Sequence, residues 1–493
     1  MNQQEDWRKI LLFPLLVVAL LLNQIWSRAS VLDRWLLLSL FLSSSLLLAL
    51  YCWLYKSTSG LQRKRRLERI ASIPLEILSS DDGVLMGEEL ELSEKIYLPD
   101  AIRKRHVHVI GATGSGKTES VILNFLRQDV KRGFGSVILD AKGDASFLED
   151  LRNHVPVEKL LVFDLGDANS IPYNPIETGS PLEAAQRLFA SLTWSEEYYK
   201  SKALSALQRL FQLHFETRDR NPTLAELAAY LETPDKYSAC VNTDDFPKAL
   251  ALEEFRELSG LRDQIRSLTL GHLLKLLSPL AETRIRLEDA QLGTVIYFRL
   301  QSLMSPQLVT VLGRLVVNHL SYLAGSAHRT GAKGSKRMTP VYLDEFASFA
   351  CTEFADLISK ARSANLALHF SHQSIGDLME VSEGFLSRIT DNAATKIVLR
   401  INDPESAEFF ARSFGTRQFQ KSTQRVTNAK DMEKAEIVGE GTIRDARQFR
   451  ASPDLLKTLP TGVGAVLVAH GKDTPEGASS VFKIRFPPLN PIG

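Results

Sequence analysis

The sequence has little cysteine and almost no excess of either charge. Three cysteines, Cys52, Cys240 and Cys351, occur among 493 residues. They are too far apart for a disulfide framework or a metal-binding pattern, so we predict small buried residues and a reducing compartment for most of the chain. Lys and Arg number 59 and Asp and Glu 58, which gives a net charge of +1. No global positive field indicates nucleic-acid binding, and any DNA contact has to come from local patches.

The sequence also contains no internal repeat, which argues against a solenoid. With 44% hydrophobic and 24% charged residues it can build a sizeable core. Its length predicts two or three domains. Local basic patches occur as RKRR at residues 63–66 and RKR at residues 103–105.

Charged residues are absent from two N-terminal stretches, residues 10–26 and 35–55. Each is long enough, or nearly so, to cross a bilayer, which takes about 20 helical residues. The alternatives are a signal peptide and a buried core helix, but SRAS after Trp26 is a poor cleavage site and a second apolar stretch follows at once. The heaviest basic flank lies after the second stretch, so we predict two membrane helices with the remainder cytoplasmic.

The soluble part alternates strand-like and helix-like segments from residue 103 onward. Continuous apolar runs of this kind are typical of a parallel sheet covered on both faces. We predict strands at residues 106–110, 136–140, 160–164, 294–300, 340–346, 366–371, 396–401, 464–470 and 481–486.

Residues 181–288 instead carry apolar residues at helical spacing, which predicts an all-helical insertion into the sheet domain. RNPT at residues 220–223 supplies a helix N-cap within it. Two segments lack a clear pattern. We predict a linker and lead-in at residues 57–100, and a long surface loop with room for a short hairpin at residues 416–450.

The stretch GATGSGKTES at residues 111–120 fits the phosphate-loop pattern G-x-x-x-x-G-K-[ST]. An apolar strand precedes it and a helix can follow. Glycines let backbone N–H groups approach phosphate oxygens, Lys117 can reach the β- and γ-phosphates, and the Thr118 hydroxyl can bind Mg²⁺. A chance match in a loop is the alternative. We expect ATP to contact Gly111, Thr113, Gly114, Ser115, Gly116, Lys117, Thr118 and Glu119.

The run VYLDEF ends a predicted strand in two acids, Asp344 and Glu345. An acid at this place can hold the Mg²⁺ shell, which we assign to Asp344. Glu345 is then placed to polarise the attacking water. An ordinary strand end with solvated acids is the alternative.

Two further residues complete the predicted catalytic set. Gln373 follows the strand at residues 366–371 and can sense the γ-phosphate; a surface glutamine is the alternative. Arg362 can act as an arginine finger on a neighbouring subunit, or simply as a cation at a helix C-terminus. For Asp140 and Asn174, in ILDAKGD and PYNPIE, a structural turn is the better interpretation.

Taken in order, the two spans, HVIGATGSGKT, ILDAKGD, YNP, the helical insertion, YLDEF and SHQS resemble the TraD/TraG/TrwB-like coupling proteins of conjugative type IV secretion systems. The resemblance implies a RecA-like P-loop ATPase domain with an inserted all-α domain, preceded by two transmembrane helices. Lys117, Thr118, Asp344, Glu345, Gln373 and Arg362 match the nucleotide-site motifs of the family. The expected domains are an anchor (1–56), a linker (57–100), a nucleotide-binding domain in two parts (101–180 and 289–493) and the all-α insertion (181–288).

The resemblance also implies function and partners. The expected protein is a homo-hexamer in the bacterial inner membrane, with both termini and the ATPase domain cytoplasmic. It would use ATP and Mg²⁺ to pump single-stranded DNA with its bound relaxase to the inner-membrane components of a secretion channel, and it would contact membrane lipid. The sequence contains no long acidic C-terminal tail of the kind that some members use to select substrates.

Two other functions stay open. An FtsK/HerA-like motor would move duplex DNA, although the strand-like VFKIRF near the end of the sequence disfavours a C-terminal winged helix. A nucleotide-switched receptor would bind protein substrates of type IV secretion. The sequence alone does not separate a DNA cargo from a protein cargo.

Overall fold

The computed structural model describes residue 78 and residues 82–488, with gaps at 244–245, 280–281, 330–336, 383, 424–425, 428–435, 438–441 and 470–478. The chain divides into two units, Met1–Ile73 and Pro74–Gly493, and the description that follows concerns the second. Both predicted membrane spans and the predicted boundary at residue 56 lie outside the described residues.

The second unit is built on one sheet of eleven strands. Seven neighbouring strands are parallel, in the order β9-β3-β8-β7-β4-β6-β5. These strands are β9 (Thr395–Val398), β3 (Val107–Ile110), β8 (Leu366–His372), β7 (Thr339–Asp344), β4 (Ser136–Asp140), β6 (Val295–Arg299) and β5 (Leu160–Asp164).

Four antiparallel strands extend the sheet beyond β9, in the order β14, β15, β1 and β2. The predicted strands near the end of the chain are β14 (Val463–Ala469) and β15 (Ser479–Arg485). The other two, β1 (Gly83–Glu89) and β2 (Glu94–Pro99), lie in the segment predicted as linker. That segment therefore contributes a hairpin to the sheet, because β1 pairs with β15 from the far end of the chain.

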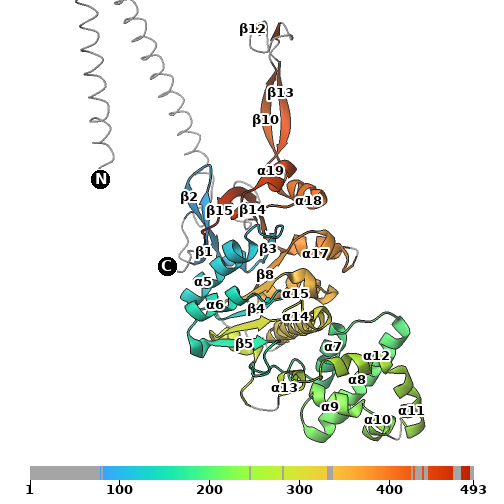
Figure 1. Ribbon diagram of the computed structural model, residues 1–493. Coiled ribbons are helices and arrows are strands. Elements are labelled where there is room, and N and C mark those ends of the chain that lie inside the picture. Colours follow the sequence, from blue (N-terminus) through green and yellow to red (C-terminus); the bar gives the residue numbers. More distant parts are fainter. Residues whose placement is uncertain are drawn as a thin grey trace, which may run out of the picture. The chain divides into compact units, whose positions relative to one another are not determined.

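Helices cover both faces of the parallel strands, with α5 and α6 on one face and α14, α15 and α17 on the other (Figure 1). Their bounds are α5 (Leu123–Lys131), α6 (Ala145–His154), α14 (Pro306–Arg329), α15 (Thr352–Lys360) and α17 (Phe385–Asn392). Among the described residues only α14 is long and apolar enough to cross a membrane, and 56% of its most apolar window is buried. Since it packs on α7 and α15, it is a core helix.

A run of helices separates β5 from β6, as the apolar spacing of residues 181–288 predicted. Ser180 and Thr223 begin two of them as capping boxes with Glu183 and Glu226, and the Thr223 cap is the one predicted from RNPT. The entry and exit of this run are tied together, because Tyr173 N donates to Leu276 O at 2.8 Å. The helices are α7 (Pro181–Ser191), α8 (Glu197–Arg218), α9 (Leu224–Tyr230), α10 (Pro234–Val241), α11 (Lys248–Glu257), α12 (Ser259–Ser267) and α13 (Leu273–Leu277).

Residues 416–449 form a longer hairpin than the sequence predicted. Strand β10 (Thr416–Thr423) pairs antiparallel with β13 (Thr442–Phe449) along the whole length of both strands. The short strands β11 (Val426–Thr427) and β12 (Glu436–Ile437) continue the pairing toward the tip. This two-stranded ribbon projects from helices α18 (Pro404–Phe414) and α19 (Pro453–Thr458) (Figure 1).

Candidate nucleotide-binding site

The phosphate-loop sequence lies between β3 and the wide helical turn η1 (Lys117–Ile122), which continues as α5. Two of its glycines are required by the local geometry. Gly116 has φ +100° at the helix start, a region that disfavours side chains. A Cβ on Gly111 would lie 2.5 Å from Ser115 Oγ and 2.9 Å from Leu399 Cβ. The loop can therefore hold this path only with glycine at both ends, as the pattern predicted.

Lys117 directs its ammonium into the loop. The side chain is 6% exposed, and Nζ donates to Gly111 O at 2.8 Å. The same Nζ lies 3.9 Å from Glu345 Oε1. A cation fixed between backbone carbonyls and a carboxylate is positioned to meet phosphate oxygens at the mouth of the loop.

The two predicted Mg²⁺ ligands are in direct contact. Thr118 Oγ1 donates to Asp344 Oδ2 at 2.7 Å, which joins the first helical turn to the end of β7. Hydroxyl and carboxylate oxygens are the hard ligands that Mg²⁺ prefers. In the part of the chain that the structure describes, no cluster of three or more His, Cys, Asp or Glu side chains could hold a metal. The residues present therefore fit a Mg²⁺ ion that takes its other ligands from phosphate and water.

Glu345 has a strained backbone and a perturbed carboxyl. Its φ of +48° lies in the left-handed region, which only a few per cent of non-glycine residues adopt and which costs about 1–3 kcal/mol. Its N–H donates to Asp344 Oδ1 at 3.1 Å and to Ser371 Oγ at 3.3 Å. Burial raises the pKa of the Glu345 carboxyl above its ordinary value, while the nearby Lys117 ammonium opposes that rise. A more basic carboxylate beside a phosphate site suits a proton acceptor.

Gln373 connects the carboxylate to the phosphate loop. Its Nε2 donates to the two carboxylate oxygens of Glu345 at 3.3 and 3.2 Å. Its Oε1 accepts from Thr113 Oγ1 at 3.1 Å. The amide that was predicted to follow β8 therefore bridges the two parts of the site.

Three residues at this site were not singled out from the sequence. Ser371, buried within β8, donates to Asp344 Oδ1 and so orients the predicted metal ligand. Thr461 Oγ1 donates to Gly114 O and Gly462 N to Ser115 O, both at 3.1 Å. The only signal for Ser371 is a polar residue in an apolar strand two positions before Gln373, and the other two residues carry no signal.

Arg362 does not join this site within the chain. It is exposed in the short turn η5 (Ala361–Ala364), immediately before β8 begins. The phosphate loop and Gln373 lie at the other end of the parallel strands, about 20 Å away for a strand of this length. Glu119 is exposed on the first turn after the loop.

Asp140 is the last residue of β4 and Asn174 immediately precedes a turn, and the side chains of both accept hydrogen bonds from the backbone that follows, in line with a structural role. Asp140 accepts from Lys142 N and Gly143 N, both at 2.9 Å, and from Tyr297 OH at 2.8 Å. Burial and the Asp344 carboxylate raise its pKa. Asn174 Oδ1 accepts from Ile176 N at 3.2 Å.

The RKR patch at residues 103–105 is not fully a surface patch, because Arg103 is completely buried.

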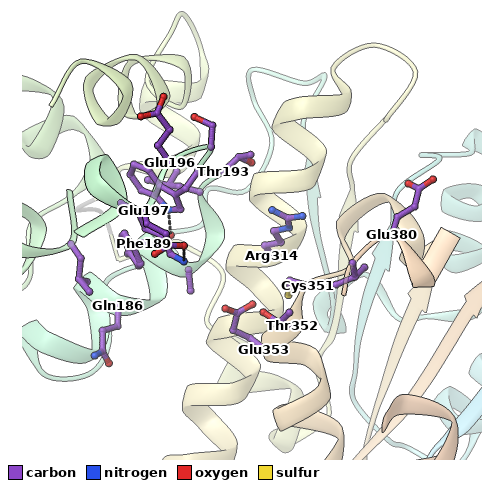
Figure 2. A pocket seen from close by; sticks show the side chains of 17 residues that line it. Gln186, Phe189, Thr193, Glu196, Glu197, Arg314, Cys351, Thr352, Glu353 and Glu380 are labelled. Atoms are coloured by element: carbon purple, nitrogen blue, oxygen red, sulfur yellow. Dashed lines mark hydrogen bonds and ion pairs between the residues drawn. The ribbon is translucent and has the colours of Figure 1, made fainter. Parts of the chain in front are cut away.

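A pocket of about 710 Å³ lies away from the phosphate loop, between α7 and the start of α8 on one side and α14 and α15 on the other (Figure 2). Acidic residues dominate its charged lining. Burial raises the pKa of its Cys351 thiol to about 12, so that thiol is not a reactive group. The charged lining residues are Glu196, Glu197, Glu353, Glu380, Lys200 and Arg314.

Two family models match the sequence. Residues 93–242 match a model described as the type IV secretion-system coupling protein DNA-binding domain. Residues 339–460 match one described as the TraM recognition site of TraD and TraG. The type 4 coupling protein DotL of Legionella pneumophila is 23% identical over 405 residues, which are 67% of this chain and 51% of DotL. The chain thus spans about half the length of this curated relative.

The fold is similar to those of several solved structures. Unbound TrwBdeltaN70, a bacterial conjugative coupling protein, matches with a TM-score of 0.62 and 16% identity over 84% of this chain and 90% of TrwB. TrwB in complex with ADP and Mg²⁺ matches with a TM-score of 0.61, 17% identity and coverages of 84% and 91%. VirB4 of Thermoanaerobacter pseudethanolicus matches with a TM-score of 0.55, 15% identity and coverages of 84% and 98%. The family models thus agree with the resemblance seen in the motifs, and the chain is similar in sequence and fold to coupling proteins of type IV secretion systems.

Proposed function

We propose that this chain is a membrane-anchored ATPase that recruits a relaxase bound to single-stranded DNA and pumps the DNA toward a type IV secretion channel. One observation carries the enzymatic part. Lys117, Thr118, Asp344, Glu345 and Gln373, which come from three separate segments of the sequence, converge at one edge of the sheet. Such convergence is what phosphoryl transfer needs, because its catalysis consists mainly of positioning and charge stabilisation.

Each residue has a role that follows from its contacts. Lys117 would bind the β- and γ-phosphates from inside the loop, while Thr118 and Asp344 would hold Mg²⁺, which neutralises phosphate charge when bound. Glu345 would orient the attacking water and accept its proton. Gln373 would report the γ-phosphate, since it contacts Thr113 of the loop and Glu345 together.

Arg362 fits a role only toward another copy of the chain. It is exposed and lies at the end of the parallel strands opposite to the candidate site of its own chain. An arginine finger supplied by a neighbour is worth roughly 10³- to 10⁵-fold in rate where it has been measured. We propose that a homo-hexamer brings this arginine to the next subunit's nucleotide.

The cargo and the location rest on the relatives and on the sequence. TrwB is named a conjugative coupling protein, and the model matched over residues 93–242 is described as DNA-binding. We propose that the helices at residues 181–288 form a separate all-α domain that meets the relaxase–DNA complex. Residues 1–56 would anchor the chain in the bacterial inner membrane by two spans and contact lipid and the channel components.

The test is ATP hydrolysis by the full chain in detergent, without DNA, with single-stranded DNA and with duplex DNA. The Lys117→Ala variant removes the phosphate-binding ammonium, and Lys131→Ala, an exposed lysine at the end of α5, is the matched control. We expect stimulation by single strands that Lys117→Ala abolishes and Lys131→Ala keeps.

The other outcomes distinguish the alternatives. Stimulation by duplex alone would indicate an FtsK/HerA-like translocase. Hydrolysis that ignores DNA and rises with a secreted protein would indicate a protein-substrate receptor. No hydrolysis under any of these conditions would reject the ATPase proposal.

A further inference from the structure

The ribbon formed by β10 and β13 presents arginine and phenylalanine side chains to solvent. Directly opposed residues of an antiparallel pair share a face. The register opposes Arg417 to Gln448 and Phe419 to Ala446, so Arg417 and Phe419 lie on one face. Arg444, two residues before Ala446, shares that face. The ribbon therefore has a face on which an aromatic ring lies among guanidinium groups.

These arginines have no protein partner among the residues that the structure describes. Arg417, Arg444 and Arg447 are exposed, and none forms an ion pair or a side-chain hydrogen bond with a described residue. Exposed arginines of a folded protein are often paired, and in this chain Arg388 and Arg412 are examples. The ribbon therefore presents exposed guanidinium groups that no described side chain neutralises.

The charge is confined to the stem of the ribbon. Residues 416–423 and 442–450 together contain five basic residues and one acid, a net charge of +4, whereas residues 424–441 contain three basic and four acidic residues, a net charge of −1. The whole chain has a net charge of only +1. The stem is thus a local basic patch, which the almost neutral composition of the whole chain does not reveal. Its charged residues are Arg417, Lys421, Arg444, Asp445, Arg447 and Arg450.

The aromatic rings favour a single-stranded ligand. Phe419 and Phe449 are each 37% exposed, on opposite faces of the ribbon. Aromatic rings beside basic groups bind single strands, because unpaired bases can stack on the rings while the phosphates meet the cations. A duplex hides its base faces and would leave both rings in water.

The ribbon is joined at its base to two helices, because α18 precedes β10 and α19 follows β13. Both helices are connected to the candidate nucleotide site. Before β10, Ser406 Oγ of α18 accepts from Ile375 N at 3.0 Å, two residues after Gln373. After β13 and α19, Thr461 and Gly462 donate to the phosphate-loop carbonyls of Gly114 and Ser115. Since α18 packs against α19, a change in the phosphate loop or at Gln373 reaches the root of the ribbon through direct contacts.

We propose that the β10–β13 ribbon is a binding arm for single-stranded nucleic acid, and that α18 and α19 link it to the nucleotide site. The inference rests on the proposed function, which supplies the cargo, but it places a contact outside residues 93–242, the segment matched to a DNA-binding description. Linkage is reciprocal, so nucleotide would change the affinity for DNA by the same factor as DNA changes the affinity for nucleotide.

The first test measures the binding of fluorescein-labelled oligothymidylate to the full chain by anisotropy over a range of salt concentrations. The triple variant Arg417→Ala, Arg444→Ala, Arg447→Ala removes three phosphate contacts. We expect the log–log salt dependence to become shallower by about 2, and affinity at about 0.15 M salt to fall on the order of 50-fold. The matched control removes three exposed charges elsewhere, as Lys131→Ala, Arg152→Ala, Lys159→Ala, and should leave both quantities unchanged.

A second variant tests stacking apart from charge. Phe419→Ala should weaken binding by roughly 5- to 150-fold with the salt dependence unchanged, and Phe419→Tyr should restore it. All of these side chains are exposed or partly exposed, so a thermal unfolding curve should show unaltered folding. Binding that the triple variant and Phe419→Ala leave intact would overturn the proposal, as would a wild-type chain that binds no oligothymidylate. An intact affinity would also direct attention to a protein partner for the ribbon.

ATP hydrolysis by the same preparations separates this inference from the proposed function. If single strands stimulate hydrolysis and the ribbon variants bind normally, the ribbon inference fails alone. If the chain hydrolyses no ATP yet the ribbon variants lose DNA affinity, the proposed ATPase function is wrong, whereas the proposal that the ribbon binds single strands is supported.

The linkage has its own readout. A non-hydrolysable ATP analogue should change the oligothymidylate affinity of the wild type. Thr461→Val and Ser406→Ala each remove one hydrogen bond between the site and the ribbon root. With the analogue at a concentration that saturates each variant, we expect both variants to show a smaller change in DNA affinity than the wild type. An unreduced change in both would reject the proposed route.

Discussion

Two polar clusters of this fold use similar residues in opposite ways. At one, Arg103 is completely buried and donates to both carboxylate oxygens of Asp129, at 2.8 and 2.6 Å. Arg103 also donates to Asp100 and Tyr342, both at 3.1 Å, and to His369 at 3.3 Å. At the other, Lys117 lies 3.9 Å from Glu345, whose side chain is 25% exposed.

The difference separates a cluster that stabilises the fold from one that we propose binds a ligand. The Arg103 cluster satisfies its charges within the protein, and the neighbouring carboxylate outweighs burial to raise the pKa of the guanidinium. The Lys117 cluster keeps a separation of 3.9 Å between its ammonium and carboxylate, a partly exposed Glu345 side chain and the left-handed backbone of Glu345. Charges that are only partly satisfied in the chain remain available to a ligand, whereas a closed cluster can only stabilise the fold.

Breaking the structural cluster should give the largest loss of stability. Arg103→Met leaves the Asp129 carboxylate buried without its partner, which costs about 3–5 kcal/mol. The thermal unfolding midpoint should fall sharply, and hydrolysis per folded molecule should stay near normal. The double variant Arg103→Met, Asp129→Leu replaces the pair by apolar groups and should recover much of the loss. If the double variant is no more stable than the single one, the ion-pair account is wrong.

Breaking the functional cluster should give the opposite pattern. Glu345→Gln keeps the shape and removes the proton acceptor, which lowers the rate of hydrolysis by about 10²- to 10⁴-fold. The unfolding midpoint should stay the same or rise slightly, because a partly buried carboxylate with a raised pKa is replaced by a neutral amide. A variant that hydrolyses ATP at the normal rate would remove Glu345 from the mechanism.

A smaller effect on hydrolysis is expected at Ser371. This residue shares features of both clusters, because it is buried like Arg103 and contacts the predicted metal ligand Asp344. Ser371→Ala removes the hydroxyl that orients Asp344. The Mg²⁺ concentration for half-maximal hydrolysis should rise roughly 10- to 100-fold, as for other lost partners of metal ligands. Ser387→Ala, an exposed serine on α17, is the control. An unchanged Mg²⁺ requirement would show that Ser371 only packs.

The smallest effect is a shift in pH dependence at Gln373. The carboxylate of Glu345 must be ionised to accept a proton, so hydrolysis should fall as pH falls through its raised pKa. The Gln373 hydrogen bond favours the ionised form and lowers that pKa. Gln373→Leu should therefore move the acidic limb of the pH–rate profile to higher pH. A shift to lower pH, or none, would contradict the assigned contact.

The parts of the fold and site that the sequence predicted depend on short-range patterns. The seven parallel strands are continuous apolar runs, and the phosphate loop and the pair Asp344–Glu345 follow directly from strand ends. The convergence of Lys117, Asp344 and Gln373 was predictable because parallel strands bring their carboxyl ends to one edge.

What the sequence did not predict depends on partners far along the chain. Strand β1 pairs with β15, as in Glu88 with Arg485, and residues 83–99 alone show no pattern strong enough to predict it. The contacts of Thr461 and Gly462 with the phosphate loop bring together segments more than 300 residues apart. The length of the ribbon was missed because its strands are polar on both faces, so no alternation of apolar and polar residues marks them.

The position of β15 between β1 and β14 has a consequence for how the protein is made. The hairpin of β1 and β2 is translated early, but its place in the sheet exists only once β15, roughly 400 residues later, has left the ribosome. At about 5–20 residues per second this interval is tens of seconds. During that time β14 is also missing and β1 is an open edge, a template for pairing with other chains. Nascent chains that stop before β15 should therefore be targets for chaperones and proteases even though their phosphate loop is complete.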